Sequence, residues 1–139
     1  MRHSQAILIL SFLAILFSPA VAQKPKESAA SYEDTLHYIQ ERLDGGLEET
    51  GHCQFVYHGS ADEIFDANLL SPRLSWEDKH EASINCSGGK QCVQYSGLDR
   101  PRDFWLFRIK TDTNRGKIEK ALLHLLNLCG VRSSKPDLF

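Results

Sequence analysis

The first 22 residues most constrain what this chain folds into, because their pattern removes them from the folded domain. Arg2 gives a positive start, an apolar run of 12 residues follows from Ala6 to Phe17, and small residues occupy positions 20–22. This is the layout of a secretory signal peptide, whereas a bilayer span needs about 20 apolar residues. We therefore expect cleavage before Gln23 and export to a periplasmic or secreted location.

The remaining 117 residues are the length of a typical single domain. Residues 23–30 are polar and contain a proline, so we expect a flexible leader ahead of a single domain over residues 31–139. The mature chain carries 15 basic and 18 acidic side chains, a net charge of −3, which argues against nucleic acid as a partner. No later segment is apolar enough to cross a bilayer, so we expect no transmembrane span after cleavage.

All four cysteines lie in the mature chain, where export favours disulfides. Four cysteines allow three pairings, and sequence alone does not choose among them. A tight turn would bring Cys86 opposite Cys92, while Cys53 and Cys129 both fall on predicted core faces. We expect disulfides Cys86–Cys92 and Cys53–Cys129, with buried free thiols at Cys53 and Cys129 as the alternative. The spacing does not match a zinc site, so no metal and no cofactor are expected.

Two helices are predicted, one at each end of the domain. Apolar residues at helical spacing place the first over residues 32–44. The second covers residues 114–129, with Asp112 or Thr113 as its expected cap and Gly130 as its terminator. Its apolar stripe is Ile118, Ala121, Leu122, Leu125, Leu128 and Cys129.

Between the helices the pattern predicts strands. Residues 52–58 alternate, with Cys53, Phe55 and Tyr57 on one face. Residues 59–68 are expected to form a loop with one helical turn, and residues 73–76 a short edge strand. Residues 82–87 and 91–96 flank Gly88-Gly89 and predict a hairpin. Residues 103–111 are apolar on both faces, which favours a central strand.

This order of elements predicts an α+β domain. We expect an antiparallel sheet of about five strands with the N-terminal and C-terminal helices packed on it. The arrangement is similar in shape to the pleckstrin-homology-like architecture, and a likeness of shape implies no function.

One basic region of the sequence is a candidate functional site. Between Arg108 and Lys120 the chain concentrates cations, and we consider an anion or lipid-headgroup site formed by Arg108, Lys110, Arg115 and Lys117 with the start of the last helix. An ordinary solvated surface is the simpler interpretation.

Catalytic motifs are absent from the sequence. His58 and the acids Asp62 and Asp66 are the residue types of a hydrolase, but no nucleophile elbow accompanies them. No catalytic residues are therefore assigned, and a small hydrolase stays the least favoured alternative. The sequence predicts a small exported, non-enzymatic binding domain stabilised by disulfides, whose partner is a protein or envelope component.

Overall fold

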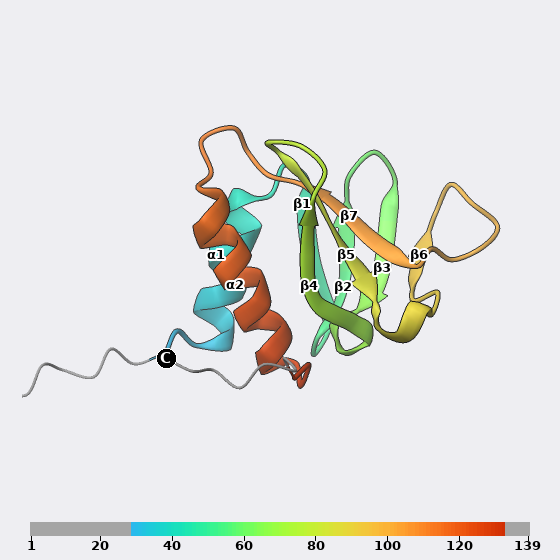
Figure 1. Cartoon of the computed structure of the whole chain (residues 1–139), viewed down its shortest axis with the longest axis horizontal. Coiled ribbons are helices and arrows are strands. Elements are labelled where there is room, and N and C mark those ends of the chain that lie inside the picture. The colour runs from blue at the N-terminus through green and yellow to red at the C-terminus, as the bar shows by residue number, and fades with distance from the viewer. Residues whose placement is uncertain (1–28, 133–139) are drawn as a thin grey trace, which may run out of the picture.

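The computed structural model describes residues 29–132 and has the predicted α+β class, with two helices and two antiparallel sheets (Figure 1). The predicted signal peptide, residues 1–22, and most of the predicted leader lie outside the described residues. Neither helix has the length and apolar content that a bilayer-crossing helix requires, in the part of the chain described.

The first helix, α1 (Tyr32–Arg42), begins where Ser31 accepts a hydrogen bond from the backbone N–H of Asp34 at 3.1 Å. It buries Leu36 and Ile39 against the core. The chain leaves the helix through Gly45, whose φ of +117° is a conformation that favours glycine.

The last helix, α2 (Arg115–Leu128), is capped by Asn114, which accepts from the N–H of Lys117 at 3.0 Å. The predicted caps, Asp112 and Thr113, were therefore wrong by one or two positions. Gly130 has φ +90° and ends the helix as predicted. The buried stripe includes Leu126, while Leu128 is 39% exposed, so the predicted stripe is correct except at its C-terminal end.

Seven strands form the two sheets, instead of about five strands in one sheet. The four-stranded sheet has the order β1 (Gly46–Gly51), β2 (Gln54–His58), β3 (Asp62–Asp66) and β6 (Val93–Tyr95). The three-stranded sheet has the order β4 (Leu70–Trp76), β5 (Glu81–Cys86) and β7 (Phe104–Arg108). Short 3₁₀ turns, η1 (Ala67–Leu69) and η2 (Ser87–Gly89), join β3 to β4 and follow β5.

Three strand predictions were wrong. Residues 59–68 contain β3 rather than a loop with a helical turn. Strands β5 and β6 do not pair as a hairpin, because they belong to different sheets. Strand β7 lies at the edge of its sheet and β5 lies at the centre. The predicted edge strand at 73–76 is confirmed as part of β4.

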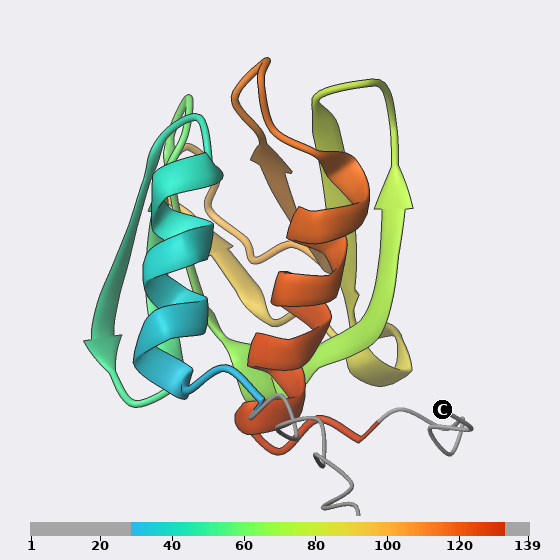
Figure 2. The ribbon, with the colours of Figure 1, turned by 90° about the vertical axis from the view of Figure 1, so that its left-hand side faces the viewer.

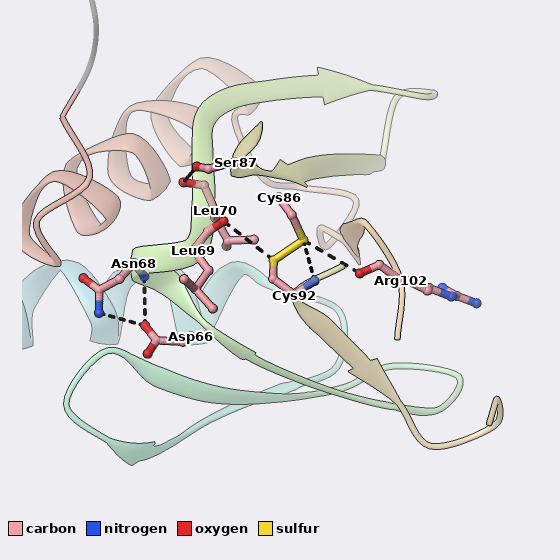
Figure 3. Close-up of a disulfide and its surroundings, with 8 residues drawn as sticks. All are labelled: Asp66, Asn68, Leu69, Leu70, Cys86, Ser87, Cys92 and Arg102. Carbon is pink, nitrogen blue, oxygen red and sulfur yellow. Dashed lines mark hydrogen bonds between the residues drawn. A yellow bond between two sulfur atoms is a disulfide. The ribbon is translucent and has the colours of Figure 1, made fainter. Parts of the chain in front are cut away.

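Both expected disulfides are present. Cys53–Cys129 ties the β1–β2 turn to the end of α2, across 76 residues of sequence. Cys86–Cys92 joins the end of β5 to the segment before β6, so it links the two sheets (Figure 3). The cysteine pairs thus hold the layers together at two separate points.

The helices lie side by side and cover one side of the strands (Figure 2). The core fills the space between this helical layer and the two sheets. At its centre Phe65 of β3 stacks on Trp105 of β7, with ring centroids 4.5 Å apart, and Tyr57 meets the edge of the same indole at 5.9 Å. These aromatic contacts bring the two sheets together where no backbone ladder joins β3 to β7.

Candidate functional site

A cleft of about 370 Å³ opens along the edge of β7 that faces away from β5. Side chains from both sheets and from the turn after α1 line it. Its polar and charged side chains are Asp44, Tyr57, His58, Ser60, Glu63, Glu81, Tyr95, Arg102 and Arg108.

The cleft exists because the outer edge of β7 has different hydrogen-bond partners along its length. Backbone bonds hold its two ends: the N–H of Arg102 donates to the carbonyl of Val93 in β6 at 2.7 Å. At the other end, the N–H of Lys110 donates to the carbonyl of Arg42 in α1 at 2.9 Å, and that of Asp44 to the carbonyl of Arg108 at 2.8 Å. Between these ends, the N–H groups of Leu106 and Arg108 bond to side chains instead of to a neighbouring strand.

Two side chains bridge the middle of the gap. The hydroxyl of Tyr57 accepts from the N–H of Arg108 at 3.1 Å and donates to the carbonyl of Asp44 at 2.6 Å. A carboxylate oxygen of Glu63 accepts from the N–H of Leu106 at 3.4 Å. The edge of β7 is thereby satisfied by groups that leave an open space beside them.

Glu63 is an inward-facing carboxyl, 4% exposed. Its burial raises its pKa to about 7, against the lowering effects of the Leu106 N–H and the Arg102 charge. The guanidinium of Arg102 lies 3.6 Å from Oε1 of Glu63. At neutral pH this carboxyl is close to half-protonated, which is unusual for a glutamate and common at functional sites.

Arg102 is held mainly by aromatic rings. Its guanidinium carbon lies 3.7 Å from the ring centroid of Tyr95 and 5.5 Å from that of Phe104. Its side chain is 24% exposed. Stacking fixes the plane of the guanidinium while leaving its N–H edge available to a ligand.

The predicted anion-binding residues have different partners in the structure. Arg108 lines the cleft and contacts Glu81 at 3.7 Å. The ammonium of Lys110 donates to the carbonyl of Glu41 at 2.8 Å, at the end of α1. Arg115 lies over the ring of Trp76 at 4.2 Å. Of the four, Arg108 lines the cleft, and Lys110, Arg115 and Lys117 do not.

His58 lies on the opposite face of β2 from Tyr57 and is flanked by two carboxylates. Its ring nitrogens contact Asp62 at 2.7 Å and Glu48 at 3.3 Å, and these contacts raise its pKa, Asp62 most. Asp66 instead accepts from Asn68 at the start of η1. Of the three residues considered for a hydrolase, His58 and Asp62 therefore contact each other across the β2–β3 pairing, whereas Asp66 does not join them.

A second surface lies on the outer face of the four-stranded sheet. We call Ile64, Leu69 and Leu98 the apolar patch; these large side chains are 46%, 48% and 53% exposed. Two hollows of about 300 and 290 Å³ adjoin it, and both are lined by Ile64 and Gln94. Leu69 lines the first and Leu98 the second, so the three residues form one continuous surface.

One strand explains both sites. Ile64 and Phe65 are adjacent, and because strand side chains alternate only one of them can face the core. Phe65 faces inward against Trp105, which turns Ile64 outward and brings Glu63 inward. Neither the cleft nor the apolar patch was predicted, because the polar residues of this segment indicated a loop rather than a strand.

The described residues contain no group of three or more His, Cys, Asp or Glu side chains arranged to hold a metal ion. Comparison with known protein families, with curated proteins and with solved structures finds no match to this chain.

Proposed function

We propose that this chain is an exported, non-enzymatic binding domain, stabilised by two disulfides, that docks a protein partner on its apolar patch. The observation that carries the proposal is that Ile64, Leu69 and Leu98 line two hollows that share Ile64 and Gln94. Three of the four exposed large apolar side chains among the described residues gather there. Single exposed apolar residues are ordinary, whereas a gathered set indicates an interaction surface.

The charges around the patch favour a basic partner. Asp66 and Asp99 line the hollows, Asp62 lies two positions before Ile64 on β3, and Glu48 lies in register with Ile64 but two strands away, on β1. The cation Arg100 lines the second hollow, and His58 contacts both Asp62 and Glu48. We expect a partner that places two apolar side chains in the hollows, one on either side of Ile64, with lysine or arginine residues around them.

The patch is supported by a rigid base. Cys92 lines the same hollow as Leu69, and its sulfur lies 3.7 Å from the carbonyl of that residue (Figure 3). The disulfide to Cys86 fixes this segment to the three-stranded sheet. A surface held in place before binding loses less conformational entropy on association.

Two alternatives receive less support. A lipid-headgroup site on Arg108–Lys120 requires its cations to converge, yet Lys110 binds a helix carbonyl and Arg115 stacks on Trp76. A hydrolase built on His58 requires that histidine to activate a nucleophile, yet both of its ring nitrogens face carboxylates.

The test compares matched surface variants of the mature domain. A protein captured from the exported fraction is purified and its affinity is measured directly. Ile64→Lys places a charge in the centre of the patch and should weaken binding about 30-fold or more, as for a central interface residue. Leu128→Lys, an exposed apolar residue on α2, is the control and should change little. Affinity should fall with added salt.

Equal affinities for the Ile64 and Leu128 variants would refute the docking site. So would capture that yields no protein binding the purified domain directly. Circular dichroism of each variant establishes that the fold is retained.

A further inference from the structure

We propose that the cleft between the sheets binds a small oxyanion, a carboxylate or phosphate group, through Arg102, with Arg108 as a second cation in the lining. This site is distinct from the apolar patch, since none of the three patch residues lines the cleft.

Arg102 is prepared for a ligand that the protein does not supply. A guanidinium has five N–H donors. Among residues 29–132 its polar side-chain contact is a single long one, 3.6 Å to Glu63, and its other contacts are aromatic faces. Its donors therefore point along the plane fixed by Tyr95, which is the geometry that binds planar or tetrahedral oxyanions.

Glu63 is a weak competitor for those donors. Both of its polar contacts, to Leu106 and to Arg102, go to Oε1. Burial favours its neutral form, so near neutral pH its charge only partly compensates the guanidinium. An incoming oxyanion can replace it as the partner of Arg102 while the protonated carboxyl stays bonded to the edge of β7.

The second cation, Arg108, can exchange its present partner for a ligand. The side chain of Arg108 is 56% exposed, and its contact with Glu81 is 3.7 Å long. Such an exposed pair contributes little to stability, so exchanging Glu81 for a ligand costs little. The cleft volume, about 370 Å³, is at the lower end for ligand pockets and fits a small molecule.

Binding should be coupled to proton uptake. An anion beside Glu63 disfavours its ionised form, so the complex forms best when this carboxyl is protonated. The other titratable or charged groups lining the cleft are Asp44, Tyr57, His58, Glu81, Tyr95 and Arg108. Of these, His58 contacts Asp62 and Glu48 through its two ring nitrogens, and these contacts raise its pKa.

The direction in which the anion affinity changes with pH follows from the fraction of Glu63 that is protonated. With a pKa of about 7, this carboxyl is about nine-tenths protonated at about pH 6 and about one-tenth at about pH 8. If only the protonated form binds, the apparent affinity falls about tenfold over that interval.

Calorimetric titration of the mature domain with sulfate and with tartrate tests the site, because both anions keep their charge between about pH 6 and pH 8. Sulfate stands for phosphate groups and tartrate for carboxylates, and the tighter probe identifies the source. We expect one saturable site that weakens about tenfold at the higher pH.

Single substitutions assign the binding to the cleft. Arg102→Gln should abolish binding, and Arg108→Gln, which leaves the stacked guanidinium intact, should weaken it. Glu63→Gln should retain the low-pH affinity and lose the pH dependence. Lys117→Gln is the matched control, since Lys117 does not line the cleft, and it should bind as wild type.

Three results would overturn the proposal. They are the absence of saturable binding at millimolar anion, unchanged binding by the folded Arg102 and Arg108 variants, and loss of binding in the Lys117 variant. None of them depends on whether a protein docks on the apolar patch.

Discussion

Replacing Glu63 by glutamine should change how the stability of this domain depends on pH. The carboxyl ionises at an ordinary pKa of 4.5 when the chain is unfolded and at about 7 in the folded domain. Between these values the folded state binds a proton that the unfolded state releases. Stability contributed by this group is therefore complete below about pH 4.5 and is lost as the pH rises to 7.

The size of the effect follows from the difference in pKa. One unit corresponds to about 1.4 kcal/mol, so ionising Glu63 inside the fold lowers the free energy of unfolding by about 3 kcal/mol. Glutamine carries no charge at any pH, and its carbonyl oxygen can still accept from the N–H of Leu106. The free-energy difference between the variant and the wild type should thus grow by about 3 kcal/mol from pH 4.5 to pH 7.

Urea unfolding, followed by the fluorescence of the two tryptophans, measures the free energy of unfolding of both chains at a series of pH values. Other groups that titrate in the interval, His58 among them, are present in both chains, so their contributions cancel in the difference. If both chains show the same pH slope, Glu63 ionises normally and the reasoning about its burial is wrong.

Two further changes test the architecture. Removing Cys53–Cys129 by paired alanine substitution should cost about 4.5 kcal/mol, against about 2 for Cys86–Cys92, because the closed loops span 76 and 6 residues. Chemical unfolding of each variant measures both costs, and equal costs would contradict the dependence on loop length. Gly45→Ala should destabilise the domain by about 1–3 kcal/mol, because φ is +117° and the added carbon would lie 2.6 Å from a carbonyl oxygen. An unchanged thermal midpoint for the Gly45→Ala variant would contradict this expected destabilisation.

The elements that could be predicted are those whose local pattern and tertiary environment agree. The last helix has a long apolar stripe and a glycine at its end, and both act in the structure as the pattern predicts. The cysteine pairing followed from which faces Cys53 and Cys129 occupy. These features depend on residues close together in sequence or on simple alternation.

The failures arise where pairing is decided by distant residues. Strand β1 has a polar edge-strand sequence with four exposed positions, so no alternation marked it. The hairpin around Gly88-Gly89 was predicted from a real turn, but β6 pairs with β3 and Arg102 closes its other edge. Apolar residues on both faces of β7 indicated a central strand, whereas its outer edge is satisfied by side chains.

The candidate site was missed for the same reason. Its charged residues, Glu63 and Arg102, are 39 positions apart in the sequence and meet only because two sheets converge. A signal was nevertheless present in Glu63-Ile64-Phe65, where two adjacent apolar residues interrupt an acidic segment. In a strand such a pair must leave one apolar side chain in solvent and turn its acidic neighbour inward.

Because Glu63 and Ile64 are consecutive in β3, the cleft and the apolar patch lie back to back, separated by the thickness of one strand. A displacement of this strand by an anion on one side would move the centre of the docking surface on the other. Any factor by which the anion changes the affinity for a protein partner must equal the factor by which that partner changes the affinity for the anion. The alternation of a single five-residue strand thus places two binding events in one thermodynamic cycle.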